Sequence, residues 1–143
     1  MKFRVAAGLA LAALAQPAFA QDTAREALHA SFALWGMMEA MANYCTEQVP
    51  GDLSFTSAHL TWQAENILIE DELEIALGVS GEPETLSAEG RAAGHDGILD
   101  IVRPATNPDE VCMNWKAETE SGGYDAETFL GYQLGILRER DGL

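Results

Sequence analysis

The chain has 143 residues, with 23 acidic and eight basic side chains and a formal net charge of −15 at pH 7. This charge repels nucleic acid and anionic lipid, so functions that need a basic surface are excluded. Hydrophobic residues make up 48% of the chain, which is enough to bury a core and excludes a disordered protein.

The first twenty residues predict a secretory signal peptide. Lys2 and Arg4 provide a positive start, residues 5–15 are an almost unbroken apolar run, and Ala18-Phe19-Ala20 is a small-residue cleavage site. The apolar run is too short to span a bilayer. We therefore expect export to the periplasm, with cleavage after Ala20.

The mature chain, residues 21–143, has the length of one domain. It retains six basic and all 23 acidic residues, a net charge of about −17. Its first residue is Gln and not the Cys that would accept a lipid. We expect a soluble protein without membrane insertion, whose charged partners are basic.

Helical periodicity predicts an all-α bundle of four or five helices. Apolar residues recur at steps of three and four along 22–44 and along 54–77. The second segment is apolar on two sides, which favours a central place in the bundle. Residues 87–102 predict a third helix, with a short strand at its end as the alternative. The segments 107–121 and 125–140 predict two further helices and begin at the capping residues Asn107 and Asp125.

Glycines fall on one side of the 87–102 segment, at positions 90, 94 and 97. Each interior glycine costs a helix about 1 kcal/mol relative to alanine. Three on one side therefore indicate either a close approach of a neighbouring helix or an irregular segment.

Cys45 and Cys112 are the only cysteines in the chain. In an exported protein such a pair predicts one structural disulfide. Cys45 ends the apolar stripe of the first helix, so we expect its side chain to point inward. No Cys-x-x-Cys redox motif and no haem-attachment motif is present. We expect a bundle that is pinned by this single link.

No spacing predicts a metal site or a bound cofactor. Glu26 and His29 have the helical spacing of di-iron bundles, but the second such pair is missing. Met38 fits the core stripe of its helix whereas Met37 faces away from it, so their sulfurs would not converge on copper. We expect no cofactor.

One proton-transfer alternative rests on Glu39 and His95. Each falls among the apolar positions of its own predicted helix. Buried together, they would have shifted pKa values suited to acid–base chemistry. The favoured interpretation is a solvent-reaching Glu39 and a satisfied core histidine, and no catalytic motif accompanies them.

A polar row on the 54–77 helix is the predicted interaction surface. It consists of four residues at i, i+4, i+7 and i+11, with a tryptophan beside it: His59, Gln63, Asn66, Glu70 and Trp62. A ligand groove and a solvated face are both consistent with such a row. Because the helix has more apolar surface than one packed side needs, we predict that an uncovered side here binds a partner protein.

Several features resemble a loose set of small exported proteobacterial proteins of unknown function. These features span about 80 residues, and they are Trp62 with Asn66, Cys45 before Pro50, and Cys112 followed by Gly123-Tyr124-Asp125. The resemblance implies a disulfide-pinned helical domain and no reaction. In outline the layout is also similar to periplasmic acid-stress chaperones, which are small, helical and pinned by one disulfide.

The sequence therefore favours a non-enzymatic periplasmic binding or accessory protein that acts through protein–protein contacts. One alternative is an acid-stress holdase chaperone, which would expose apolar surface when its carboxylates become protonated. The other is a small-molecule or metal-binding helical protein that uses the row beginning at His59. The expected partner is a periplasmic protein.

Overall fold

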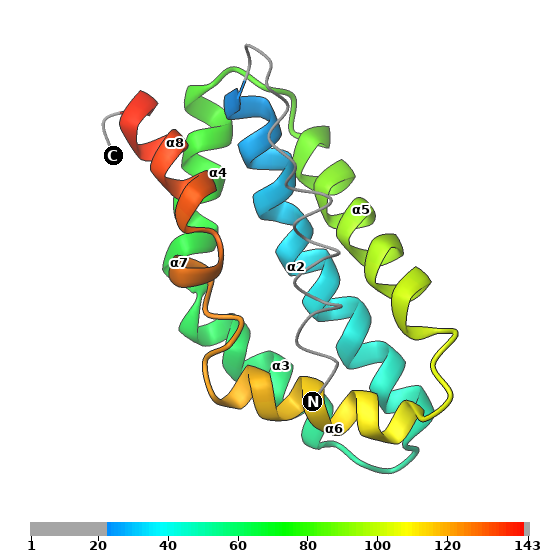
Figure 1. The fold of residues 1–143 in the computed structure, drawn as a ribbon. Coiled ribbons are helices and arrows are strands. Elements are labelled where there is room, and N and C mark those ends of the chain that lie inside the picture. The colour runs from blue at the N-terminus through cyan, green and yellow to red at the C-terminus, as the bar shows by residue number, and fades with distance from the viewer. Residues whose placement is uncertain (1–22, 142–143) are drawn as a thin grey trace.

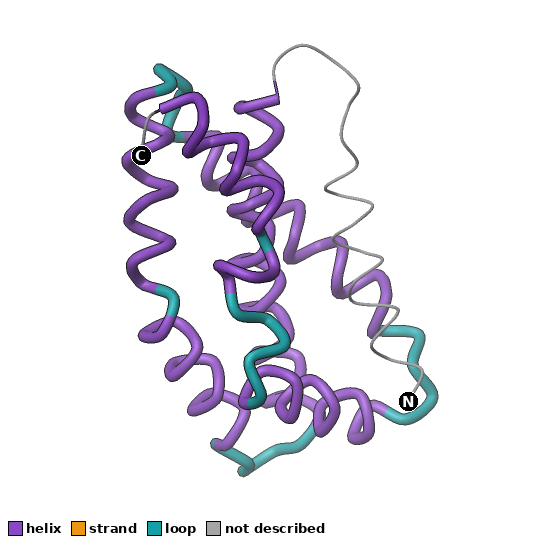
Figure 2. Tube along the Cα trace, turned by 60° about the vertical axis from the view of Figure 1, so that its left-hand side comes forward, coloured by secondary structure: helices purple, strands orange, loops and turns teal. Residues whose placement is uncertain are grey.

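The structure is a computed structural model that describes residues 23–141, all of it helices joined by loops (Figures 1 and 2). The predicted signal peptide lies outside these residues. Over the described range no strand occurs, so the all-α prediction is confirmed and the end of the 87–102 segment is helical. The helices are α2 (Thr23–Gln48), α3 (Ser54–Glu65), α4 (Ile67–Val79), α5 (Thr85–Val102), α6 (Pro108–Glu120), α7 (Ala126–Phe129) and α8 (Gly131–Asp141).

Helix α2 is the central element of the bundle. It runs between α5 on one side and the α3–α4 arm on the other (Figure 1), and it contacts α3, α4, α5, α6 and α8. Buried side chains occur all around it and include Met37, which was expected to face away from the core. The prediction that the 54–77 helix is central is therefore wrong. Helix α2 fits the centre better, because its many alanines let neighbours approach closely.

Glycines let α2 and α5 pack backbone to backbone. A Cβ atom placed on Gly94 would lie 1.9 Å from the carbonyl oxygen of Ala33. A Cβ on Gly36 would lie 1.8 Å from the carbonyl oxygen of Arg91. No side chain larger than hydrogen fits at either place. Of the two alternatives for the glycine side of α5, close helix approach is confirmed.

Two of the predicted helices are each divided by one residue. The 54–77 segment breaks at Asn66, whose φ of −106° and ψ of 9° lie outside the α-helical range. The last predicted helix breaks at Leu130, with φ of −98° and ψ of 16°. Periodicity continues through both breaks, so the number of helices was underestimated.

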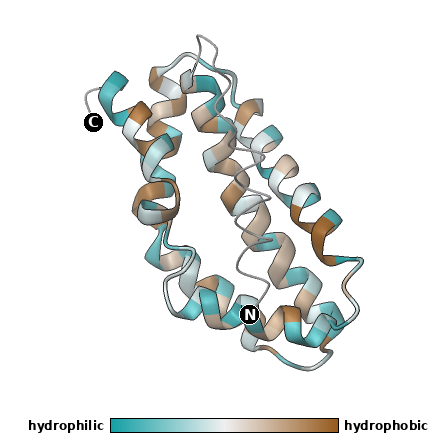
Figure 3. Cartoon of the chain, viewed as in Figure 1, coloured by the Kyte–Doolittle hydropathy of each residue, from teal (hydrophilic) through white to brown (hydrophobic). Residues whose placement is uncertain are grey.

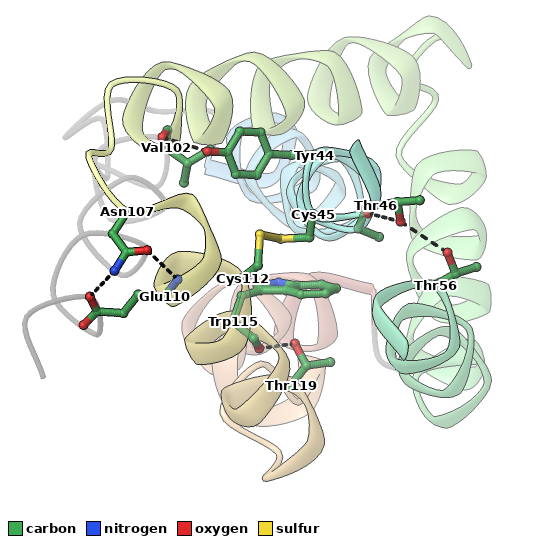
Figure 4. The surroundings of a disulfide bond; sticks show 11 residues. Tyr44, Cys45, Thr46, Thr56, Val102, Asn107, Glu110, Cys112, Trp115 and Thr119 are labelled. Atoms are coloured by element: carbon green, nitrogen blue, oxygen red, sulfur yellow. Dashed lines mark hydrogen bonds between the residues drawn. A yellow bond between two sulfur atoms is a disulfide. The ribbon is translucent and has the colours of Figure 1, made fainter. Parts of the chain in front are cut away.

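The disulfide joins the end of α2 to α6, which crosses the end of the bundle (Figures 1 and 4). The Cα atoms of Cys45 and Cys112 are 5.4 Å apart, and both side chains are fully buried. This confirms the predicted link. Nearby, the Tyr44 hydroxyl donates to the carbonyl of Val102 at 3.3 Å, and the side chain of Asn107 caps α6. The disulfide ties α2 to α6, and the Tyr44 bond ties α2 to the end of α5.

Hydrophobic segments occur on the outer helices as well as at the centre, and the last turns of α5 are among the most hydrophobic (Figure 3). Over residues 23–141, no helix combines the length and the apolar character needed to cross a bilayer.

Candidate interaction surface

The predicted polar row does not form one accessible surface. Trp62 and Asn66 are buried, with only 2% and 3% of their surface exposed, and they cannot contact a partner. His59, Gln63 and Glu70 are half-buried. The row lies along the border of the packed side of α3 and α4, because Trp62 itself packs into the core.

Trp62 and Asn66 instead fix the segment that leads into α7. The indole nitrogen of Trp62 donates to the carbonyl of Tyr124 at 2.8 Å. The Asn66 side chain accepts from the backbone N–H of Ala126 and donates to the carbonyl of Trp62, both at 2.8 Å. The tryptophan–asparagine spacing and the Gly-Tyr-Asp run noted in the sequence are thus two halves of one structural contact.

Replacing Asn66 by alanine is expected to lower the free energy of unfolding by about 1–3 kcal/mol, because it leaves the buried N–H of Ala126 without a partner. Gln63→Ala, one turn away and half-buried, should change it by less than about 0.5 kcal/mol. Urea denaturation followed by circular dichroism measures both. Equal effects of the two variants would contradict the structural role of Asn66.

His59 is the one member of the row with an unusual electrostatic environment. Its ring stacks on Trp62 with centroids 6.3 Å apart, and Trp62 in turn lies against Trp35. Its buried Nε2 atom has no hydrogen-bond partner among the described residues. Burial lowers the pKa of His59, and the negative charge of Glu39 opposes that shift in part. The neutral imidazole is therefore favoured in the folded protein.

The lowered pKa of His59 predicts a loss of stability on acidification. The unfolded chain takes up a proton near the ordinary histidine pKa of 6.5, whereas the folded chain does so only at lower pH. The contribution of His59 to the free energy of unfolding should therefore fall as the pH drops through 6.5. His59→Gln should reduce this pH dependence. A ring-proton NMR titration with a His59 midpoint above 6.5 would contradict the prediction.

The buried acid–histidine pair does not form. Glu39 is exposed on α2. His95 is half-exposed on α5, and its Nδ1 lies 3.0 Å from a carboxylate oxygen of Asp96. The favoured placement of Glu39 at a solvent-reaching position agrees with the structure, but His95 is not a core histidine. Within residues 23–141, no three His, Cys, Asp or Glu side chains are grouped to hold a metal ion.

The accessible part of α3 and α4 is a different line of residues, which we call the outer row. Its apolar members are exposed to solvent, with 76% of Leu68 and 62% of Val79 accessible. The row continues across the break at Asn66 with helical spacing of three and four. It consists of Leu60, Ala64, Ile67, Leu68, Asp71, Ile75 and Val79.

Apart from Asp71 and Val79, the outer row is one of the two apolar stripes visible in the sequence, formed by Leu60, Ala64, Ile67, Leu68 and Ile75. The other stripe, represented by Phe55, Trp62 and Leu73, packs inward and is buried. The sequence predicted that one side of this segment is left uncovered, but it placed the interaction surface on the polar row and not on the outer row. The choice between the stripes follows from the tryptophan contacts inside the bundle, which local periodicity does not reveal.

Carboxylates border the outer row on both sides. On one side Glu70 accepts from Arg91 of α5 at 2.7 Å. On the other side the Glu72 carboxylate accepts from the guanidinium of Arg138 of α8 at 2.6 and 2.9 Å. Charge-assisted pairs of this kind fix α4 to both neighbours. Between residues 26 and 90 the chain contains no lysine or arginine, so the cations beside the outer row come from α5 and α8.

The chain matches no known protein family, no curated protein and no solved structure. The function is therefore inferred from the outer row itself, from its exposure, its length and its charge.

Proposed function

We propose that this protein is an exported, non-enzymatic accessory protein that binds a positively charged partner protein through the outer row. One observation carries the proposal. Eight large apolar side chains of the described residues are exposed, and five of them, Leu60, Ile67, Leu68, Ile75 and Val79, lie in this single line. Isolated exposed apolar residues are ordinary, whereas a contiguous group of them is typical of a protein–protein interface.

The charge of the chain supports a basic protein as the occupant. Two copies of the mature chain, each with about 17 negative charges, repel one another, so a second copy is disfavoured. Nucleic acid and anionic lipid are repelled for the same reason. A partner with a basic surface is attracted over distances of about 10 Å at ordinary ionic strength.

Site-specific photo-crosslinking in cells tests this function. A photoreactive amino acid replaces Leu68 on α4 or, as the matched control, Met113 on α6, which is also more than half exposed. We expect one defined crosslinked protein, with a basic contacting segment, from position 68 and none of it from position 113. The same products from both positions, or no product from position 68, would refute the proposal.

A further inference from the structure

Asp71 interrupts the apolar part of the outer row. It follows Leu68 by three residues and precedes Ile75 by four, so all three lie on one face of α4. Asp71 is exposed, while Leu73 on the opposite face is fully buried. A partner that covers Leu68 and Ile75 therefore also covers the carboxylate between them. Removing that carboxylate from water is costly unless it gains an opposite charge.

Among the described residues, the acids on either side of Asp71 are paired with arginines, whereas Asp71 is not. Glu70 and Glu72, on either side of it in sequence, are bound by Arg91 and Arg138. Within residues 23–141 no lysine or arginine pairs with Asp71. The cation that would compensate its burial must therefore come from the partner.

The shape of the row favours a helix as the contacting segment. From Leu60 to Val79 the row follows α3 and α4 over at most roughly 28 Å at 1.5 Å per residue, about five helical turns, with a change of direction at Asn66. Side chains at steps of three and four form a ridge that fits the groove of a second helix. The described residues contain no strand, and so offer no sheet edge to an extended peptide.

We propose that the partner binds the outer row through one amphipathic helix of four to five turns, and that a lysine or arginine within its apolar face pairs with Asp71. This inference rests on the proposed function and specifies its partner. Apolar contacts with Leu68 and Ile75 supply affinity. The buried pair at Asp71 fixes the register of the helix and rejects helices with an uninterrupted apolar face.

A designed peptide tests the pairing. The probe is an 18-residue helix of Leu, Ala and Lys with a leucine face and one central lysine in that face. Its binding is measured by fluorescence anisotropy at 25 and 150 mM salt. Asp71→Lys should weaken binding about fivefold or more, because it places like charges together. The control Asp100→Lys makes the same change of charge at an exposed residue of α5 and should weaken binding less than about twofold.

The reciprocal peptide makes the test specific. When its central lysine is changed to glutamate, we expect weaker binding to the wild type and restored binding to Asp71→Lys. Circular dichroism verifies that each variant folds. Asp71→Asn removes the negative charge without adding a positive one, so it should weaken binding of the lysine peptide less than Asp71→Lys does. Equal weakening by Asp71→Lys and Asp100→Lys, or no binding of the lysine peptide to the wild type at 100 µM peptide (about 5.5 kcal/mol of binding free energy), would overturn the inference. A partner captured at position 68 through a non-helical segment would overturn it while leaving the proposed function intact.

Discussion

Replacing Gly94 by alanine is expected to destabilise the fold by about 3 kcal/mol, near the upper end for an overpacked core. The added Cβ would lie 1.9 Å from the Ala33 carbonyl oxygen and 2.6 Å from its carbonyl carbon. Both atoms belong to the backbone of the central helix and cannot turn aside as a flexible side chain can. The helices must separate, and every contact between α2 and α5 weakens with them. Urea denaturation monitored by circular dichroism measures the loss.

Gly135→Ala is the matched control, because it makes the same substitution within helix α8. A Cβ at Gly135 meets nothing within 4 Å, so only the intrinsic helix propensity changes. That change should stabilise the protein by up to about 1 kcal/mol. The two variants are thus expected to differ in sign. A loss below about 1 kcal/mol for Gly94→Ala would show that α2 and α5 are not packed as closely as described.

Local features of the sequence were sufficient to predict most helices. Apolar residues at steps of three and four, with capping residues such as Asn107 and Asp125, predicted where the elements lie. The glycine side of α5 was visible because several glycines on one face weaken a helix unless a neighbour packs closely against them. The disulfide was predictable because the sequence predicts export and two cysteines allow only one pairing.

Long-range contacts explain what the sequence did not reveal. The break at Asn66 is fixed by a bond to Ala126, sixty residues away. No local signal marks it, since Asn66 also fits the polar face of an unbroken helix. For the same reason Trp62 and Asn66 were predicted to be surface residues, although their bonds to the 124–126 segment bury them.

The candidate surface shows the same limit. Periodicity identified two apolar stripes on the 54–77 segment but not which of them packs. Trp62 decides this, because its ring lies 5.3 Å from that of Trp35 on the central helix. Once that contact forms, Leu68 and Ile75 are turned outward. A sequence-based prediction would have needed to know that α2, and not the 54–77 segment, occupies the centre.

Removing the disulfide is expected to have the largest effect of any change considered. Cys45 and Cys112 are 67 residues apart. Closing a loop of that length lowers the conformational entropy of the unfolded chain, which stabilises the folded protein by about 4 kcal/mol at 25 °C. A single domain of this size has only about 5–15 kcal/mol of stability. Reduced protein should therefore unfold at a much lower urea concentration than oxidised protein, measured on the same preparation with and without reductant.

Comparison with Cys45→Ala/Cys112→Ala separates the link from its packing. The reduced wild type loses only the covalent bond, whereas the double variant also loses two buried sulfur atoms and should be less stable still. Because both cysteines are fully buried, reductant should react slowly with the folded protein and quickly once urea opens it. Equal midpoints for reduced and oxidised protein would show that the loop between the cysteines is already constrained in the unfolded chain. Fast reduction without urea would show that the junction of α2 and α6 opens readily in the native state.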